Sequence, residues 1–557
     1  MKPSPPNPIV RLLPSLTDLA FLLPVIFLFT RMQGASTMLG DGDTGWHIRT
    51  GEWILANGRV PVSDFFSFTK AGEPWYAWEW LWDVTFAGLY HHGGLATVVV
   101  ASILVLCLTF ALLFRLISRH TTNPVIAIGL TFLACAGSSM HWLARPHLFS
   151  LLFLVIFLTI LDRVREGRTR LLILLPLLTA LWTNLHGAFF IGLLVLFAYI
   201  AGELASAAVT PDREIRTGAL HRARLYAITF LACAAATFVN PYGYRLHAHL
   251  IEYLSDPFQF HYIVEFLSIS FQNPAALYFE IVLALGTMVA FWKITQRRFV
   301  DVFLFAGWAH LGLLSARNIP LFLIVATPIV GAGLSEMLER FPRADVAAWL
   351  KRTVAGFEGI AGEFGAIDKH WRLYPLSILA IAILAAALHA PVSSKKLKAE
   401  YDPEKYPSKA LDFIQSSGFA HRIFTDDQWG DYLLYRLYPA QKSFVDGRSD
   451  FYGGKFDEKF VDAMNVKYDW EQYLNGYKID TIMLPATSAL AGALKESRHW
   501  RVVYDDTIAI IFRPANKLAP EGQLVSTPFG GEKNRDPRIT KSGCDPRITA
   551  VKQSKGA

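Results

Sequence analysis

A chain of 557 residues with 53% hydrophobic and only 18% charged residues is too apolar for a row of soluble domains of that total length. Its formal net charge of +7 does not indicate nucleic-acid binding, because the basic residues are spread over many loops and form no single patch with aromatic platforms. The four cysteines, Cys107, Cys135, Cys233 and Cys544, show neither a disulfide framework nor the spacing of a zinc knuckle.

Membrane-spanning helices are the first predicted elements. Long apolar runs alternate with short charged loops, and about 20 apolar residues cross the hydrocarbon core, so we predict about eleven spans. The segment Leu19–Phe29 is interpreted as a retained first helix, because no small-x-small cleavage pattern follows it. The predicted spans centre on Phe27, Ile103, Leu130, Leu154, Leu178, Leu194, Phe230, Leu283, Phe305, Val325 and Ile383.

The distribution of Lys and Arg predicts the sidedness of these spans. Basic residues collect in alternate loops, such as 163–170, 213–224 and 293–298, and positively charged loops are retained in the cytoplasm. With an odd number of spans the N-terminus is cytoplasmic, and everything after Pro391 lies on the outer face. We therefore expect an integral protein of a bacterial inner (plasma) membrane with a periplasmic or extracellular C-terminal region.

A change in composition separates the transmembrane region, residues 1–393, from a polar region at residues 394–514. Here helix-like runs such as Pro407–Ser417 alternate with strand-like runs, a pattern that predicts a small α/β domain on the outer face. The final stretch, residues 515–557, is rich in Gly, Pro and Lys and is predicted to be disordered. The strand-like runs are Arg422–Thr425, Ile479–Leu484 and Thr507–Arg513.

The first outer loop, residues 34–83, gives the strongest functional signal, because loops of this length in compact proteins are usually functional. It opens with Asp41 and Asp43 in a Gly-Asp-Gly-Asp-Thr-Gly turn directly after the first span. A carboxylate held there could act as general base toward an acceptor, or bind a divalent cation that neutralises a leaving phosphate. The alternative is an Asx-type turn that caps the next helix.

Two aromatic groups follow in the same loop. Trp46, Arg49 and Trp53 are spaced like an amphipathic helix that lies in the membrane interface. Further on, residues 73–83 set five aromatic residues among three acids, one of which is Glu79. Such a cluster can stack on a sugar or a prenyl chain, but an interfacial aromatic belt is the alternative that we favour.

Four more outer turns carry polar residues at membrane depth, where a polar group is costly unless it is used. Arg145 and Arg317 stand out on a side that is poor in arginine, and a planar guanidinium is a good phosphate clamp. The alternative for both is a side chain that reaches the lipid headgroups. The turns are Met140–His147, Trp182–Gly187, the long loop that opens at Asn240 and contains Glu265, and Ser315–Pro320.

The histidines in these turns are His141, His147 and His186. No two of them have metal-ligand spacing within one segment. Structural hydrogen bonding is therefore favoured over a zinc site.

Together these residues resemble the GT-C class of membrane glycosyltransferases, and in particular the catalytic subunits of oligosaccharyltransferases. In that family the first outer loop carries an Asp followed by an aromatic residue, an Arg and then Asn-Gly; Asp43, Trp46, Arg49, Asn57 and Gly58 are similar in order and spacing. The resemblance implies a polyprenyl-phosphate-linked sugar donor at the outer leaflet. It gives Asp43 the catalytic or metal-binding role.

The resemblance extends to other loops. Glu265 resembles a second acid that the family places in a long outer loop, and Arg317 resembles its arginine that faces the lipid phosphate. The segment 427–432, which contains Trp429 and Asp431, is similar to the Trp-Trp-Asp-Tyr-Gly acceptor motif of the family.

The second outer loop departs from the family pattern. The family has paired acids there, whereas residues 138–147 carry Arg and His and no carboxylate. This departure favours a metal-independent arrangement, as in GT-C enzymes that glycosylate hydroxyls or lipids.

We therefore expect a polytopic α-helical, GT-C-like membrane protein that transfers a sugar from a polyprenyl-phosphate-linked donor to a glycan, lipid or protein acceptor. Asp43 would deprotonate or orient the acceptor, while Arg317, with Arg145, stabilises the departing phosphate. A divalent cation, Mg²⁺ or Mn²⁺, is the one cofactor considered, with Asp43 as its ligand. A transporter or flippase and a non-catalytic envelope scaffold are the alternatives. The catalytic candidates are Asp43, Asp41 and Glu265, and the substrate-binding candidates are Arg145, Arg317, His47, Arg49, His147, His186, Glu79, Asn240, Trp429 and Asp431.

Overall fold

The structure is a computed structural model, and it describes residues 12–121, 123–343, 345–368, 373–391, 394–418 and 422–517. The tail that the sequence predicts to be disordered therefore lies, after its first three residues, outside the described part of the chain.

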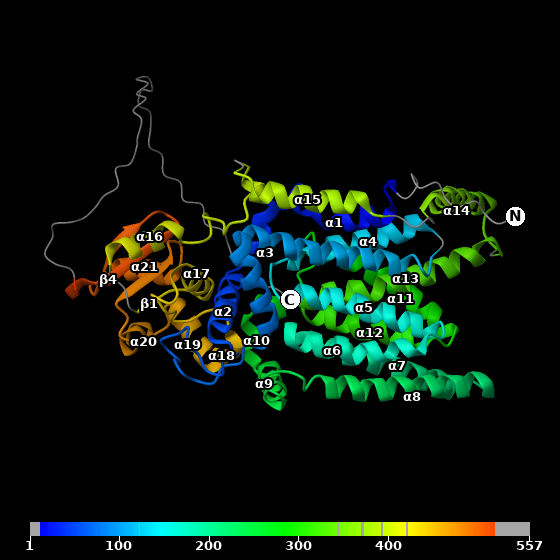
Figure 1. Cartoon of the computed structure of the whole chain (residues 1–557), viewed down its shortest axis with the longest axis horizontal. Coiled ribbons are helices and arrows are strands. Elements are labelled where there is room, and N and C mark those ends of the chain that lie inside the picture. Colours follow the sequence, from blue (N-terminus) through cyan, green and yellow to red (C-terminus); the bar gives the residue numbers. More distant parts are fainter. Residues whose placement is uncertain are drawn as a thin grey trace, which may run out of the picture. The chain divides into compact units, whose positions relative to one another are not determined.

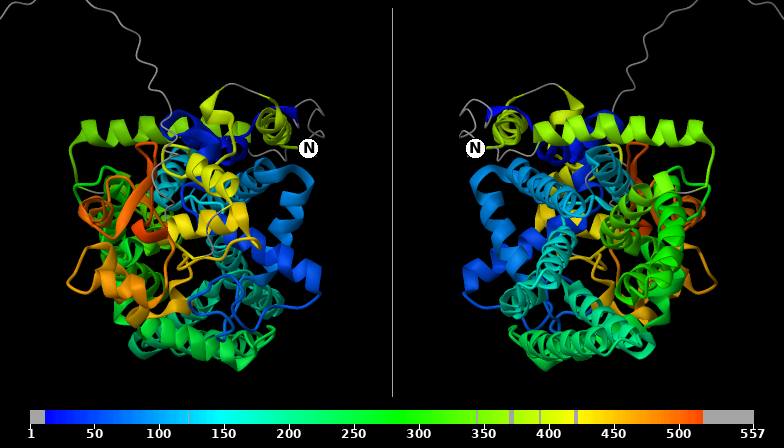
Figure 2. Two further views of the ribbon diagram at one scale, coloured as in Figure 1. Left: turned by 90° about the vertical axis from the view of Figure 1, so that its left-hand side faces the viewer. Right: turned by 90° about the vertical axis from the view of Figure 1, so that its right-hand side faces the viewer.

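The bundle of apolar helices contains all eleven predicted span centres. Figures 1 and 2 show its helices running side by side. Its members are α1 (Leu16–Arg31), α3 (Trp80–Ile117), α4 (Pro124–Ser138), α5 (His147–Arg165), α6 (Leu174–Leu185), α7 (Phe190–Val209), α8 (Arg213–Ala236), α11 (Ala276–Thr295), α12 (Phe299–Leu314), α13 (Ile319–Arg340) and α15 (Pro375–His389). The remaining helices of this region are α2 (Asp43–Asn57), α9 (Tyr244–Ser255), α10 (Pro257–Tyr262) and α14 (Ala348–Asp368).

Among the described residues, six helical segments are long and apolar enough to cross a membrane, and three shorter helices are apolar. The chain is therefore an integral membrane protein. The predicted count of eleven stays a prediction for the other helices, since α1 has only 16 residues and the first half of α8 is charged. The six segments are Trp80–Ile117, Pro124–His141, His147–Arg165, Gly187–Val209, Ala276–Thr295 and Ala316–Arg343.

Helix α3 is longer than a bilayer requires and is broken at a pair of glycines. Gly94 has a positive φ of 63°, a conformation that a residue without Cβ adopts without steric cost, and Gly93 beside it is also non-helical. The break separates a first part, which carries Trp82 and Asp83 toward the first loop, from an apolar second part inside the bundle.

The C-terminal region contains the predicted small sheet. The strand order is β1-β2-β4-β3; β1 and β2 are parallel and the other pairs are antiparallel. Three of the four strands were predicted, but β3 was not, because it is a largely exposed edge strand without a clear apolar alternation. The strands are β1 (Ile423–Phe424), β2 (Thr481–Pro485), β3 (Trp500–Asp505) and β4 (Ala509–Pro514), and the helices around them are α16 (Ser408–Ser417), α17 (Asp427–Leu437), α18 (Ser449–Tyr452), α19 (Gly454–Met464), α20 (Trp470–Gly476) and α21 (Ala489–Glu496).

Helix α2 packs between α3 of the bundle and α17 of the C-terminal region. The predicted helix is thus confirmed, but its Trp46 is covered by protein and does not face lipid. Its Trp46 is only 6% exposed and packs in a cluster with Trp75 and side chains of the C-terminal region. The physical reason is that the C-terminal region packs on this aromatic face and excludes lipid from it.

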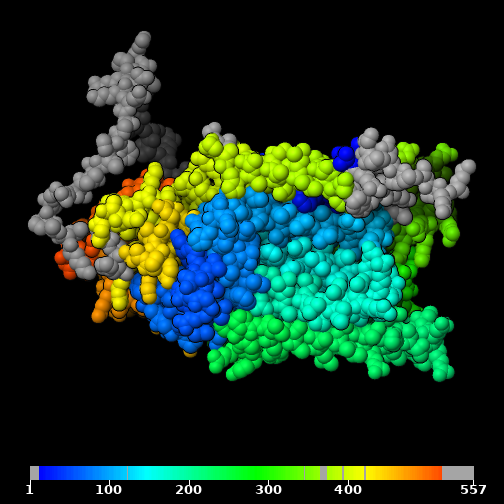
Figure 3. All heavy atoms as spheres, in the orientation of Figure 1, coloured from blue at the N-terminus to red at the C-terminus, as the bar shows by residue number. Residues whose placement is uncertain are grey.

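The rest of the first loop is also joined to the C-terminal region. Ser67 pairs with Ser443 as an isolated parallel bridge, and the Thr69 hydroxyl donates to the Phe444 carbonyl at 2.7 Å. Figure 3 shows the blue first loop beside the yellow surface of that region. Trp75 and Trp82 are 2% and 0% exposed, so the favoured aromatic-belt interpretation is wrong for these two side chains.

Candidate functional site

Arg145 joins the acids of the first loop. Its Nη1 lies 2.6 Å from Asp41 Oδ2, and its Nη2 forms an ion pair with Asp43 Oδ2. Glu265 Oε1 lies 3.8 Å from the same Nη1 and 3.9 Å from His141 Nδ1. The turns before α2 and α5 and the loop after α10 therefore meet at one point, with three carboxylates around one guanidinium.

The local sequence explains why Asp43 stands where it does. Asp43 is the first residue of α2, where the helix dipole favours a negative charge, and its N–H donates to Asp41 Oδ1 at 3.1 Å. Gly42 and Gly45 allow α17 to approach, since a Cβ at either position would lie 2.6 Å from the Cβ of Asp431 or Tyr435. The glycine-rich turn thus brings the C-terminal region directly onto the acids.

Asp431 of α17 completes the cluster. Its Oδ1 accepts the Gly447 N–H at 2.8 Å, and no group among the described residues donates a hydrogen bond to its buried Oδ2. A Cβ built on Gly447 would lie 2.1 Å from Asp43 Oδ1 and 2.8 Å from Asp431 Oδ2. The two carboxylates therefore face one another against the bare Cα of Gly447.

Burial governs the protonation of these acids. It raises the pKa of Asp41 to about 7 and raises the pKa of Asp43, in both cases against the opposing charge of Arg145. Burial and the charge of Asp43 raise the pKa of Asp431 well above its usual range. For Glu265 burial is outweighed by Arg145 and Arg317, so its pKa is lowered. An Asp43–Asp431 pair can thus share one proton.

The donor set does not fit the divalent cation considered from the sequence. Arg145 already binds the Oδ2 atoms of both Asp41 and Asp43, and its guanidinium fills the position between them and Glu265. Within the part of the chain that the structure describes, no group of three or more His, Cys, Asp and Glu side chains could hold a metal ion. The positive charge at Asp43 is supplied by an arginine.

A buried row of acids and imidazoles continues from this cluster. His47, one helical turn after Asp43, lies with Nδ1 2.7 Å from Asp83 Oδ1 and with Nε2 3.3 Å from Glu79 Oε2. Glu79 Oε1 in turn lies 3.4 Å from His186 Nε2, and Ser150 Oγ lies 2.7 Å from His186 Nδ1.

The charges in this row are also set by burial. Burial raises the pKa of Glu79 to about 8 and lowers the pKa of His47 well below its usual value. His186 Nδ1 accepts the Ala188 N–H, so its Nε2 carries the ring proton and donates to Glu79. A protonated Glu79 can therefore donate to His47 Nε2 and not to His186.

Comparison with known proteins identifies the fold. No family model and no curated relative matches the chain in sequence. The oligosaccharyltransferase of Archaeoglobus fulgidus in its apo form matches with a TM-score of 0.52 at 11% identity, over 84% of this chain and 69% of that chain. The same archaeal enzyme in complex with an inhibitory peptide and a dolichol-phosphate matches with a TM-score of 0.51 at 12% identity, over 91% and 74%.

The chain has the fold of an archaeal oligosaccharyltransferase. The resemblance to GT-C membrane glycosyltransferases that the first loop predicted is therefore confirmed, and at this identity it is a likeness of fold.

Several candidate residues of the oligosaccharyltransferase-like fold gather at the cluster. Arg317 lies with its guanidinium carbon 4.4 Å from the centre of the Phe266 ring, next to Glu265. No carboxylate among the described residues is within ion-pair distance of Arg317, in contrast to Arg145. His147 packs on His141 with ring centres 4.4 Å apart and lies 2.7 Å from the His141 carbonyl oxygen.

Other candidates lie elsewhere in the fold. The Asn240 side chain closes its own turn by accepting the Tyr242 N–H at 2.8 Å, and the Trp429 ring is 5% exposed with Nε1 donating to the Lys405 carbonyl. Arg49 donates to the Tyr435 carbonyl and to Glu52, so it ties α2 to α17. These three side chains hold the scaffold in place rather than facing the acids.

Sequence reasoning missed the segment 446–448. Arg448 is 1% exposed, lies 2.9 Å from Asp64 and 2.6 Å from Asp446, and stacks over Trp75 at 4.5 Å. This ion pair locks the first loop onto the C-terminal region and presents Gly447 to the acids. The available signal was an Asp-Gly-Arg triplet directly after the apolar pair Phe444-Val445.

Proposed function

We propose that this protein is a membrane glycosyltransferase that transfers a sugar from a polyprenyl-phosphate-linked donor to an acceptor at the outer face of a bacterial inner membrane. The observation that carries the proposal is the position of Asp43. It is a 4%-exposed carboxylate at the start of α2, held by Arg145 and covered by α17, within an oligosaccharyltransferase-like fold.

The chemistry follows from the acids and arginines. Asp43 takes the proton from the acceptor group, whose lone pair attacks the anomeric carbon of the sugar. The bond between that carbon and the phosphate oxygen breaks, the configuration inverts, and the lipid phosphate leaves as an anion. Arg317, which is free of carboxylates among the described residues, stabilises that charge in a water-poor site.

Arg145 has a different role in this proposal. The sequence suggested that it assists Arg317 at the phosphate, but its guanidinium is already engaged by Asp41 and Asp43. It supports Asp43 as the base, because an opposite charge favours the ionised carboxylate against burial. The same engagement supports a metal-independent reaction.

The position of the C-terminal region supports the proposal that the acceptor enters beside α17. Asp431 and Gly447 reach the catalytic candidate from that region, so an acceptor bound there would be delivered to Asp43. The proposed acceptor is a glycan, a lipid or a protein that carries a hydroxyl or amide group.

The test compares Asp43→Asn with Asp212→Asn in cells, with lipid-linked sugars and envelope glycans profiled. Asp212 is an exposed helix cap, a position where Asn serves as well as Asp, so it controls for the same chemical change. We expect D43N to accumulate the lipid-linked donor and lose a glycan, with transfer reduced about 10²- to 10⁴-fold. An unchanged glycan profile with D43N correctly inserted would remove the enzyme proposal and leave the transporter and scaffold alternatives.

A further inference from the structure

A small pocket lies directly beside the turn that carries the acids. It has a volume of about 270 Å³ and is lined by residues of the 3₁₀ helix η2 (Gly34–Leu39) and of the segment 402–406, which precedes α16. Gly40, the residue before Asp41, also lines it. The pocket is smaller than the roughly 300–1,000 Å³ of sites for drug-sized ligands, so it has room for one compact group and not for a long chain.

Both walls of the pocket are fixed by hydrogen bonds of their own. In the first wall the Gln33 N–H donates to Thr37 Oγ1 at 3.1 Å. In the second wall the Asp402 carbonyl accepts the N–H groups of Lys405 and Tyr406, both at 2.9 Å. The pocket is therefore preformed, and a preformed site costs a ligand less ordering of the protein.

Tyr406 joins the pocket to the acid cluster. It is 4% exposed, and its hydroxyl has no hydrogen-bond partner among the described residues although the residue lines the pocket. Its ring is held by Tyr401 and Tyr432, with ring centres 4.9 and 5.1 Å away. Burial raises the pKa of Tyr406, and the negative charges of Asp41 and Asp431 raise it further. A protonated, unpaired phenol this deeply buried points to a polar ligand.

The lining of the pocket is polar but carries no net charge. The neutral hydrogen-bonding side chains are Gln33, Ser36, Thr37 and Tyr406, the charged ones are Asp402 and Lys405, and the larger apolar ones are Met32 and Leu39. Hydroxyl and amide groups that donate and accept without net charge match an uncharged ligand rich in hydroxyl groups, which is the chemistry of a neutral sugar. A phosphate would need an excess of basic groups, and an acyl chain would need an apolar wall.

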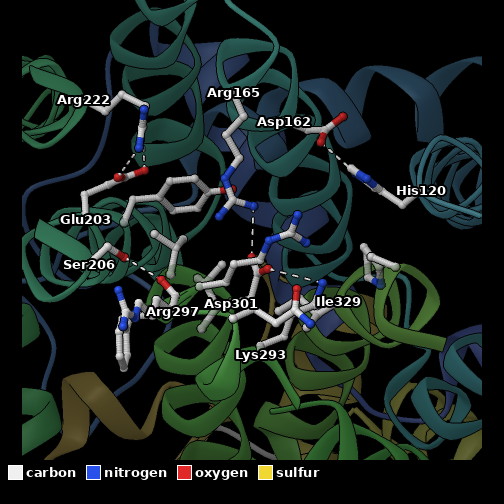
Figure 4. Close-up of a pocket in the computed structure, with 18 of the residues that line it drawn as sticks. His120, Asp162, Arg165, Glu203, Ser206, Arg222, Lys293, Arg297, Asp301 and Ile329 are labelled. Atoms are coloured by element: carbon white, nitrogen blue, oxygen red, sulfur yellow. Dashed lines mark hydrogen bonds and ion pairs between the residues drawn. The ribbon is translucent and has the colours of Figure 1, made fainter. Parts of the chain in front are cut away.

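A larger cavity in the helix bundle differs from this pocket. It has a volume of about 730 Å³, and its charged side chains pair with one another, as Figure 4 shows for Arg165 with Asp301 and for Arg222 with Glu203. The buried Lys293 is paired as well. These ion pairs account for the charges there without a ligand, whereas the small pocket contains a buried hydroxyl that no described side chain satisfies.

We propose that the small pocket holds a neutral sugar unit of the acceptor, so that the acceptor is a glycan. The inference rests on the proposed function and deepens it. A hydroxyl of that glycan gives its proton to Asp43 and bonds to the anomeric carbon, while the bond from that carbon to the phosphate oxygen breaks. The pocket reaches the cluster at Asp41, whereas Arg317, the proposed phosphate clamp, lies beside Glu265. Separate approaches fit an inverting displacement, because the acceptor and the leaving phosphate must lie on opposite sides of the anomeric carbon.

The experiment measures glycan binding to the full-length protein by saturation-transfer difference NMR. The protein is placed in nanodiscs, because the headgroup of a maltoside detergent is itself a sugar. The probe is the mixture of neutral oligosaccharides that mild acid releases from the envelope of the source organism. We expect the wild type to bind this probe and Tyr406→Phe, which removes only the hydroxyl, to bind it about 10-fold more weakly. The matched control is Tyr468→Phe, the same change at an exposed position, which should leave binding unchanged.

A second variant blocks the pocket sterically. Ser36→Phe places a ring in the pocket and should abolish glycan binding, and thermal unfolding checks that each variant is folded. Equal binding by wild type, Y406F and S36F would overturn the proposal. Binding of a tryptic digest of envelope proteins in place of the glycan mixture would overturn the glycan assignment in favour of a peptide acceptor.

Two further readouts separate this inference from the proposed function. Asp43→Asn should bind the glycan mixture as wild type does but transfer no sugar. Transfer by a wild-type protein that binds no neutral glycan would contradict the pocket assignment alone, whereas glycan binding without any transfer would contradict the proposed function and the acceptor role together. The lipid-linked sugar that co-purifies with the protein is also extracted and counted. Equal amounts with wild type and Y406F support the acceptor assignment, and a loss with Y406F would assign the pocket to the donor sugar.

Discussion

Asp431 of α17 faces Asp43 of α2, and the two carboxylates meet at the Cα of Gly447. One acid belongs to the first loop and the other to the C-terminal region. The candidate site of this oligosaccharyltransferase-like fold is therefore formed only when the two regions pack together.

Gly447→Ala tests that contact. The new methyl group would lie 2.1 Å from Asp43 Oδ1, so the carboxylate must move. We expect sugar transfer to fall by about 100-fold or more, because a displacement of that size misaligns a reacting group. The control is Gly492→Ala in α21, where a Cβ meets no atom within 4 Å and activity should be retained. Full activity of G447A in a reconstituted transfer assay would contradict the assignment of Asp43 as the base.

Two substitutions of Asp431 test whether the pair shares a proton. Burial raises the pKa of both acids, so the pair is expected to carry one proton, donated by Asp431 to Asp43. Asp431→Leu removes the donor, which raises the pKa of Asp43 and moves the acid limb of the pH–rate profile to higher pH. Asp431→Asn keeps an N–H donor and should leave that limb near its wild-type position. Identical profiles for D431L and D431N would exclude proton sharing.

Arg145→Gln should be strongly destabilising. It leaves Asp41 and Asp43 buried without their counter-charge, a loss that costs about 3–5 kcal/mol. The double variant Asp41→Asn/Arg145→Gln removes one of the stranded charges and should recover part of that stability. Thermal unfolding of the purified proteins measures both effects, and equal unfolding temperatures for R145Q and wild type would show that the ion pairs contribute nothing.

Chelation is expected to leave transfer unchanged. The guanidinium of Arg145 pairs with the carboxylates of both Asp41 and Asp43, which are the acids that a cation there would need as ligands. Dialysis against EDTA followed by the transfer assay, with and without added Mn²⁺ or Mg²⁺, checks this directly. A rate that falls on chelation and returns with the metal would refute the metal-independent mechanism.

The raised pKa of Glu79 predicts that the stability of the folded protein depends on pH. Burial raises its pKa from 4.5 to about 8, so the folded protein holds this proton where the unfolded chain has lost it. Stability from this group is present at low pH and is lost as pH rises through that interval. Glu79→Gln mimics the protonated acid, so its unfolding temperature should fall less steeply between pH 5 and pH 8 than that of wild type. Glu214→Gln, at an exposed position of α8, should keep the wild-type slope.

The sequence by itself determined the membrane-embedded class, the positions of the eleven apolar helices and most of the small sheet, and it indicated the Asp41–Asp43 turn as a candidate site. These features rest on local patterns, namely apolar runs, alternation and a glycine-flanked pair of acids. Periodicity reports such patterns residue by residue, whatever the rest of the chain does.

Only the tertiary structure decided what the acids touch. It showed that Arg145 binds Asp41 and Asp43, that Asp431 faces Asp43, and that Arg448 locks the first loop in place. It also moved Trp46 and Trp75 from an expected lipid interface to a protein interior. Each of these contacts joins residues far apart in the chain, and their burial and pairing depend on how whole regions pack, which no local pattern records.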